Sequence, residues 1–557
     1  MQAAKEEKKE ATGAQVQAQA TSSEPGSAHL SRYLMTKKGY LHPMRTYVWL
    51  TLFVTGLMSA LWFVVGIGPS AQGTIPPAFA FGASDLYFHS IAIGLASLLV
   101  IFVVITFELD KYEPNVDFPI AYRATLATIV GGVGGFLYLT PVFHAWFAPL
   151  PIGLLFLAML LLADVGGALL LQLYLLPAKL TGRYDAKNNS FGMVPRWSNL
   201  PRWAEFRKMD GAYWLTFVTI VATFIAGVMG FIVFWLQYFV VDFGVSSSLF
   251  NGYIAWMGGA SALVGGTMGS HGHVIGITII LGVVAVTAKR FGVLSLSGWK
   301  RNLASAGMWV SGIGIAVMTL TYIVEGFTQV WPSGPPLLFA SNATTPMQLY
   351  AFGLLNANGM AGDDSTMFLA SLGAMIMLVP LLLTSIRGKP AWKDPIRLAV
   401  LGTWALAYLA TPIQGFMIEF NEASWAGTPL DLAYGSQQYF ALFGLAMVAA
   451  AFLAVDFFQD GDGSKKFVAR FGMLIATIAV VVGIAFTWLD AGVLAADGSL
   501  AVTNTGWVYA AALALVSLVA LVAARAVYKG SEEPTIIPTA AAGGPAIRAS
   551  PKDTEGG

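Results

Sequence analysis

The sequence contains no cysteine and few charged residues. With no Cys among its 557 residues, the chain can form no disulfide, thiolate metal site, iron–sulfur cluster or covalently attached c-type haem. Only 11% of its residues are Asp, Glu, Lys or Arg, against about 25% in a typical soluble domain. With 56% hydrophobic residues and a mean hydropathy of +0.67, this composition excludes a water-soluble globular enzyme. Any metal-binding group must use the six His, the 20 Met or the 30 carboxylates.

Long apolar segments are what the sequence has instead. Uninterrupted apolar runs of 18 or more residues are typical of transmembrane helices. We predict twelve spans, at 46–66, 86–108, 122–146, 150–177, 212–238, 271–288, 303–325, 365–386, 397–416, 435–456, 467–489 and 505–527. The predicted fold class is therefore an all-α polytopic membrane protein.

Polar segments flank this region. Residues 1–44 and 529–557 lack the apolar density to pack, and we expect both to be disordered tails around a membrane domain at 45–528. Nothing apolar precedes about Thr46, so the N-terminus does not resemble a cleavable signal peptide. The first span is then expected to act as an uncleaved anchor.

The basic residues are distributed asymmetrically. If the N-terminus is cytoplasmic, all 31 Lys and Arg fall in the tails, in the inner loops or at inner helix ends. The predicted outer loops, including residues 326–364, contain none. Because cytoplasmic loops carry an excess of Lys and Arg, this partition predicts twelve spans with both termini inside, in the plasma membrane of a prokaryote. An extra span at 250–269 would reverse the pattern, so we expect that glycine-rich stretch to be re-entrant or interfacial.

Three histidines lie at matching depth near the predicted outer face. His89 is close to the outer end of the second span, and His271 and His273 begin the sixth. Ionisable groups inside a membrane usually face the bundle interior, and neutral imidazole is the commonest metal ligand. The alternative is that each histidine hydrogen-bonds the backbone of a neighbouring helix. His144, among aromatic residues, is expected to be an interfacial anchor.

Polar clusters recur every four spans. The segments YFHSIAIGLA, SHGHVIGITI and SQQYFALFGL enter the second, sixth and tenth spans, and the last contains Gln438. The recurrence predicts three pseudo-repeats of four helices.

This arrangement resembles subunit I of the haem–copper oxidase and nitric oxide reductase superfamily, nearest to its divergent, archaeal-like ba-type members. The likeness extends over roughly residues 45–528. It implies twelve helices in three pseudo-repeats, with ligands near the outer face. His89 matches the family's low-spin haem ligand, His271 matches the histidine of its H-P-x-V-Y motif, and Pro380 matches a proline within its eighth helix.

The chain departs from the family at several ligands. Glu325-Gly326-Phe327-Thr328-Gln329 stands where the family has a pair of copper-binding histidines. Ser436-Gln437-Gln438 replaces its H-x-H haem motif, and Ile275 replaces its tyrosine. A three-histidine copper centre is therefore incomplete, and the chain's own oxygen-reducing activity is in doubt.

A b-type haem is the cofactor that the resemblance implies. His89 would hold it, with a sixth ligand from Gln438, a Met, His271 or His273. Bis-His or His/Met ligation is typical of electron-transfer haems. Alternatively, His271 and His273 would help to bind copper or another metal. Residues two apart on a helix point about 200° apart, so one shared ion would require an unwound helix end. Asp164, near the middle of the fourth span, is a candidate proton relay or an interhelical hydrogen-bonding group.

Three functions remain open from the sequence. The first is a haem-binding subunit of a respiratory membrane oxidoreductase, with other subunits as partners and a quinol or small redox protein as electron donor. The second is a cofactor-free homologue with a structural or proton-conducting role, and the third is a secondary transporter. The lipid bilayer is a partner in every case, with the basic inner loop 178–211 expected against its anionic face, and nothing indicates nucleic-acid binding.

Overall fold

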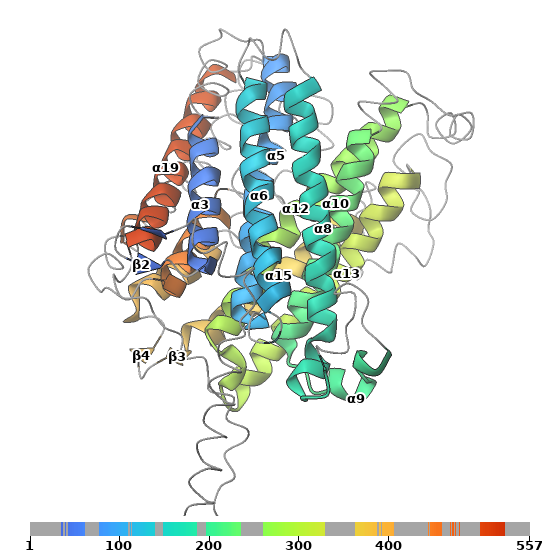
Figure 1. The fold of residues 1–557 in the computed structure, drawn as a ribbon, viewed down its shortest axis with the longest axis vertical. Coiled ribbons are helices and arrows are strands. Elements are labelled where there is room, and N and C mark those ends of the chain that lie inside the picture. The colour runs from blue at the N-terminus through green and yellow to red at the C-terminus, as the bar shows by residue number, and fades with distance from the viewer. Residues whose placement is uncertain are drawn as a thin grey trace, which may run out of the picture. The chain divides into compact units, whose positions relative to one another are not determined.

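The described part of the protein is almost entirely helical. The computed structural model describes residues 35–36, 39–40, 43–61, 77–109, 112, 114–139, 149–185, 197–235, 260–328, 362–386, 389–390, 393–405, 444, 446–458, 468, 470–472, 474, 478 and 502–529. Within them the long helices are α3 (Pro43–Leu61), α5 (Pro77–Thr106), α6 (Pro114–Leu139), α8 (Pro149–Leu180), α10 (Gly211–Trp235), α12 (Ala260–Arg290), α13 (Trp299–Thr328), α15 (Gly362–Leu382) and α19 (Val502–Lys529) (Figure 1). The chain divides into one unit at Met44–Tyr528 and another made of Met1–Pro43 and Lys529–Gly557.

Short elements connect some of these helices. They are η4 (Trp197–Asn199), α9 (Trp203–Phe206) and η6 (Val293–Ser295). Two antiparallel hairpins of two-residue strands pair β1 (Met35–Thr36) with β2 (Gly39–Tyr40) and β3 (Ser385–Ile386) with β4 (Lys389–Pro390).

Six of the described helices are long and apolar enough to cross a membrane. Their apolar segments are Met44–Leu61, His89–Thr106, Pro119–Tyr138, Pro149–Leu180, Gly211–Trp235 and Trp299–Ile323. Shorter apolar helical segments occur at Leu369–Leu382, Ala446–Phe458 and Leu515–Tyr528. An all-α chain with several potential spans is thus confirmed, while the number twelve, the pseudo-repeats and the sidedness of the termini stay predictions.

The largest difference from the predicted spans is at the start of the sixth. The helix α12 begins at Ala260, well before the predicted residue 271, so the second half of the glycine-rich stretch 250–269 is regular helix. Residues 260–269 are therefore helix continuous with the sixth predicted span, and a re-entrant or interfacial position for this stretch stays a prediction. A helix satisfies every backbone polar group within the segment, which a membrane environment demands, and glycine is tolerated there.

Glycines in α6 let three helices approach it closely. A Cβ built at Gly132 would meet Val54 of α3, and one at Gly135 would meet Ser90 of α5. A Cβ at Gly134 would lie 3.0 Å from backbone atoms of α8. Small residues in membrane helices allow such packing, because van der Waals contact between backbones replaces the hydrophobic effect as the driving force.

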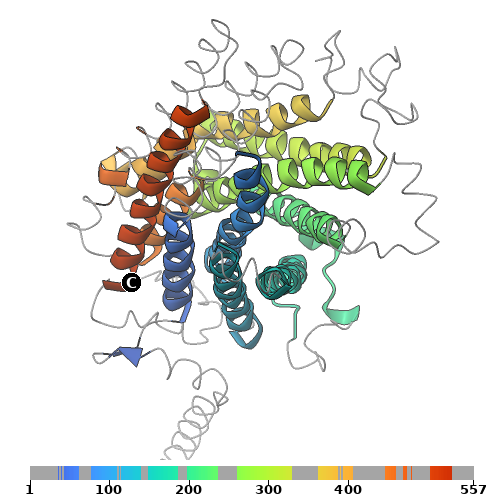
Figure 2. The same cartoon turned by 90° about the horizontal axis from the view of Figure 1, so that it is seen from above.

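The helices α3 and α19 pack together, although they are far apart in the sequence of the unit Met44–Tyr528 (Figures 1 and 2). The Nε of Arg45 donates a hydrogen bond of 2.6 Å to the carbonyl oxygen of Val527. The rings of Trp49 and Tyr528 have centroids 5.1 Å apart, and a Cβ at Gly56 would lie 3.0 Å from Ala520. The first and last long helices of the unit are therefore joined side by side.

Basic side chains gather where α8, α10, α12 and α13 begin or end. Lys179 is in the last turn of α8, Lys289 and Arg290 end α12, and Lys300 and Arg301 begin α13. The Nζ of Lys289 lies 2.5 Å from Oδ2 of Asp210, the residue directly before α10. This ion pair joins the end of α12 to the start of α10. We call this region the basic end.

Candidate functional site

Two of the three predicted histidines come together in the structure. His89 in α5 and His271 in α12 have ring centroids 6.2 Å apart, and their ring planes differ by only 3°. Both helices run from the histidines toward the basic end, since Phe107, directly after α5, has its ring centroid 5.5 Å from Nζ of Lys289 near the end of α12. The two residues are therefore at the same level of the two helices, while their depth near an outer membrane face stays a prediction. We call them the histidine pair.

A backbone carbonyl orients the His271 ring. Its Nδ1 lies 2.6 Å from the carbonyl oxygen of Ala226 in α10. A carbonyl oxygen can only accept a hydrogen bond, so Nδ1 carries the proton and donates it. The Nε2 atom of a neutral ring then keeps its lone pair. Metal-binding histidines typically show this arrangement, in which the second ring nitrogen donates to a carbonyl that fixes the tautomer.

Gly230 makes room for the same ring. A Cβ built at this position of α10 would overlap the imidazole of His271 and leave 2.8 Å to its Nε2. Glycine is therefore the residue that allows the ring to lie against α10. Ala226 and Gly230 are one turn apart, so a single stretch of α10 both receives and orients His271.

The ring separation matches two imidazoles on opposite sides of one metal. Metal–imidazole bonds are about 2.0–2.1 Å long and the ring centre lies about 1.1 Å beyond the nitrogen, so a trans pair has centroids about 6.3 Å apart. Two imidazoles on a tetrahedral metal would have centroids only about 5 Å apart. The observed 6.2 Å is close to the first value, and the two rings are nearly parallel and stacked, an arrangement that also occurs without a metal.

The other predicted ligands are not part of this pair. The backbone at His271 and His273 is continuous α-helix, so the unwinding needed for both to bind one ion does not occur. Residues two apart on a helix face opposite directions, so a shared ion at these two residues stays a prediction that would require the helix to unwind there. Gln438 and His144 lie outside the described residues. Within the described part of the chain, no group of three or more His, Asp or Glu side chains is arranged to hold a metal ion.

Asp164 has a charged partner that its sequence neighbourhood does not reveal. Its Oδ2 accepts from Nη1 of Arg123, which belongs to α6. Both side chains are partly exposed. This pair joins α6 to α8 and satisfies the carboxylate, which accords with an interhelical hydrogen-bonding role. A proton-relay role for Asp164 stays a prediction.

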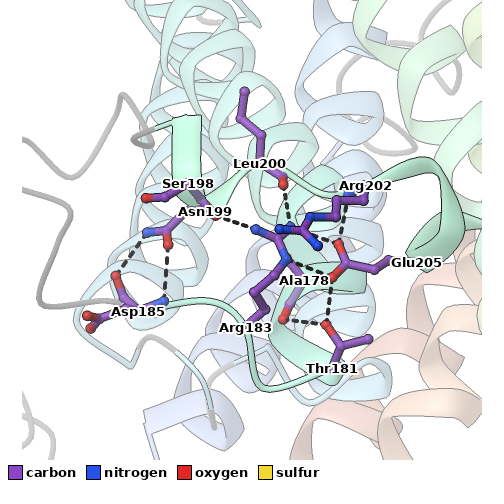
Figure 3. Close-up of polar contacts among 9 residues, drawn as sticks. All are labelled: Ala178, Thr181, Arg183, Asp185, Ser198, Asn199, Leu200, Arg202 and Glu205. Atoms are coloured by element: carbon purple, nitrogen blue, oxygen red, sulfur yellow. Dashed lines mark hydrogen bonds and ion pairs between the residues drawn. The ribbon is translucent and has the colours of Figure 1, made fainter.

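A second charged pair fixes the segment between α8 and α10 (Figure 3). Arg183 holds Glu205 with two bonds, Nε to Oε1 and Nη2 to Oε2, each 2.8 Å long. The same guanidinium donates to the carbonyls of Ser198 and Leu200. Glu205 also accepts from the backbone N–H of Arg202 at 2.7 Å and from the hydroxyl of Thr181 at 3.0 Å. These donors lower the pKa of the Glu205 carboxyl to about 2.

A third carboxylate links distant parts of the chain at their basic residues. Asp456 accepts from Nε of Arg290 at 3.0 Å, and its other oxygen lies 3.8 Å from Nε of Arg397. The Asp456 side chain is only 6% exposed. The Arg290 guanidinium lies 4.5 Å from the ring centroid of Phe457, which adds a cation–π contact. These contacts connect the segments that carry Arg290, Arg397 and Asp456.

Sequence reasoning missed the residues that support the histidine pair. Ala226 acts through its backbone carbonyl, which every residue has, and Gly230 is one of 60 glycines. Neither gives a sequence signal by itself. The Arg123–Asp164 pair had a weak signal, since each is an isolated charge within a predicted span and antiparallel neighbours bring such charges together.

Comparison with known proteins identifies no relative of this chain. No family model, no curated protein and no solved structure matches it.

Proposed function

We propose that the protein is a haem-binding membrane protein that transfers electrons in a respiratory chain. The observation that supports this most directly is the histidine pair, which brings two imidazole rings from α5 and α12 to within 6.2 Å of each other, so that both would be able to hold one haem. The fixed tautomer of His271 supports it further, because the hydrogen bond to Ala226 leaves Nε2 as a ligand atom. The same bond also satisfies the alternative in which His271 only hydrogen-bonds the backbone of a neighbouring helix, so the haem content decides between the two.

The histidine pair also indicates what a bound haem would do. A haem held by both histidines would supply one-electron transfer. His89 and His271 would hold the iron, Ala226 would orient the second ring, and Gly230 would admit it. This proposal favours electron transfer over oxygen reduction by this chain.

The wider setting is part of the same proposal. We infer twelve spans in three pseudo-repeats with both termini cytoplasmic, in a prokaryotic plasma membrane, and partner subunits of a terminal-oxidase-like complex. The clustering of Lys and Arg at one end of α8, α10, α12 and α13 supports a common inner side for these ends. The electron donor would be a quinol or a small redox protein.

The test is a difference spectrum of the purified full-length protein. Dithionite-reduced minus oxidised spectra and a pyridine haemochrome assay should show b-type haem. Substituting either histidine, as His89→Ala or His271→Ala, should remove the same haem, because each supplies one axial ligand. Loss of haem in one variant and full retention in the other would reject the pair as a joint site.

Two glycine variants in α10 distinguish a specific effect on the histidine pair from a general effect of alanine in this helix. Gly230→Ala places a methyl group against the His271 ring and should lower the haem content or shift the spectrum. Gly227→Ala, one turn earlier on the same helix, meets nothing within 4 Å and should leave both unchanged. Folded protein that contains no haem after supplementation during expression would contradict the proposal and favour a structural subunit or a transporter.

A further inference from the structure

A cavity of about 740 Å³ opens at the basic end. It is formed where α9 leads into α10, where α12 ends, and where η6 leads into α13. The side chains that matter for its chemistry are Trp203, Arg207, Asp210, Lys289, Arg301 and Trp309. The 18 positions from His271 to Lys289 correspond to about 27 Å along α12, so the cavity is separate from the histidine pair.

The cavity has an excess of positive charge that the protein does not neutralise. Its carboxylate, Asp210, is already engaged, since Oδ1 accepts from the backbone N–H of Tyr213 at 2.8 Å and Oδ2 pairs with Lys289 at 2.5 Å. Arg207 and Arg301 are exposed, and neither forms an ion pair with any described residue. Two guanidinium groups are therefore available to an anion from outside the chain.

Aromatic side chains line the same cavity as Arg207 and Arg301. Trp203 is 72% exposed and Trp309 is 54% exposed, although both are large and apolar. Trp299, at the start of α13, is 60% exposed. Tryptophan is enriched at the level of lipid headgroups, where its ring contacts acyl chains and its N–H reaches polar groups. Exposed Trp beside unpaired Arg is thus typical of a membrane interface.

We propose that this cavity binds the headgroup of an anionic phospholipid. The phosphodiester lies between Arg207 and Arg301, whose planar guanidinium groups suit phosphate oxygens, and an acyl chain extends over Trp309 along α13. The charge excess selects an anionic headgroup over a zwitterionic one. This inference requires that the helices span a membrane, and it is independent of whether the histidine pair binds haem.

The experiment compares lipid binding by the full-length protein in detergent. Native mass spectrometry gives the dissociation constant of the first bound dioleoyl phosphatidylglycerol and that of dioleoyl phosphatidylcholine, which has the same acyl chains. Phosphatidylglycerol should bind at least about tenfold more tightly. The double variant Arg207→Gln/Arg301→Gln should abolish that preference.

A matched control tests whether the cavity or the overall charge is responsible. Lys208→Gln/Lys300→Gln removes two neighbouring cations that do not line the cavity and should keep the preference. Equal losses in the two double variants would overturn the proposal, because the effect would then be general surface charge. Displacement of the lipid by millimolar inorganic phosphate alone would also overturn it, since the cavity would then bind a free anion. Retained haem content in both variants would show that the two sites are independent.

Discussion

At the scale of single residues, Glu205 shows how much one carboxylate can organise. It receives hydrogen bonds from Arg183, Arg202 and Thr181, which come from both sides of the segment that connects α8 with α10. Its side chain is only 10% exposed, while that of Arg183 is 24% exposed. Several of the bonds that hold the segment carrying Trp203 and Arg207 therefore meet at one carboxylate.

We predict that Glu205→Gln destabilises the protein in a pH-dependent way. The folded-state pKa of about 2 lies below the ordinary 4.5, so the ionised carboxylate contributes stability above about pH 4.5 that is lost as the pH falls toward 2. At pH 7 the variant should lose about 1 kcal/mol, because solvent partly screens the pair. Thermal unfolding in detergent should show this difference at pH 7 and a smaller one at pH 3.5.

The exposed cation Lys208 provides the control for that experiment. Lys208→Gln changes a charge close to Glu205 but breaks no ion pair among the described residues. Its effect on unfolding should be near zero at both pH values. A Glu205→Gln difference that grows toward low pH would have the wrong sign for a carboxyl with a lowered pKa.

The candidate site was only partly predictable at this scale. His89 and His271 stand out because ionisable residues are rare in apolar spans, and their common depth follows from counting along two helices. Their actual contact depends on which helices are neighbours, which one sequence does not reveal. The support from Ala226 and Gly230 is invisible in the sequence, because a backbone carbonyl and a missing side chain leave no pattern.

At the scale of elements, small residues determine how closely α13 and α15 approach (Figure 2). A Cβ at Gly314 would overlap the backbone of Ala370, and a Cβ at Gly373 would overlap the backbone of Ser311. The hydroxyl of Ser311 donates a hydrogen bond of 2.7 Å to the carbonyl oxygen of Ala370. The two helices are therefore in backbone contact, a geometry that larger residues would prevent.

We predict that Gly314→Val forces these helices apart and destabilises the protein by about 2 kcal/mol or more. The clash is with backbone, which cannot change rotamer to relieve it. Gly312→Val on the same helix is the matched control, since a Cβ there meets nothing within 4 Å. Thermal unfolding should show a larger loss of stability for Gly314→Val than for Gly312→Val. Equal losses would mean that valine in this helix, rather than the contact between α13 and α15, causes the destabilisation.

Helix positions were more predictable than helix ends. Apolar runs locate α8 and α10 within a few residues of their observed bounds, because a membrane-spanning segment must be apolar along its whole length. The start of α12 was missed by eleven residues, from the predicted 271 to the observed Ala260. Its eight residues from Ala260 to Thr267 include two glycines, which weaken helix propensity in water but matter less in a bilayer.

At the scale of the whole chain, the unit Met44–Tyr528 is closed by its first and last long helices. We predict that a chain ending at residue 500, which lacks α19, loses stability because the contacts that Arg45, Trp49 and Gly56 of α3 make with α19 are then missing. Size-exclusion chromatography of a fluorescent fusion should show aggregation or a reduced monodisperse peak.

Removal of residues 530–557 alone is the control for that truncation, because it leaves α19 intact. This shorter truncation should behave as the full-length protein does. Co-expression of residues 501–557 as a separate chain should restore the monodisperse peak of the chain ending at 500. An unchanged profile without α19 would mean that α3 does not depend on it.

The hydrogen bond between Arg45 and Val527 joins residues 482 positions apart. At a synthesis rate of about 5–20 residues per second, the ribosome needs roughly 25–100 seconds to travel that distance. Throughout that interval α3 exists without its final neighbour. The contact between α3 and α19 can therefore form only after almost the whole chain has been made.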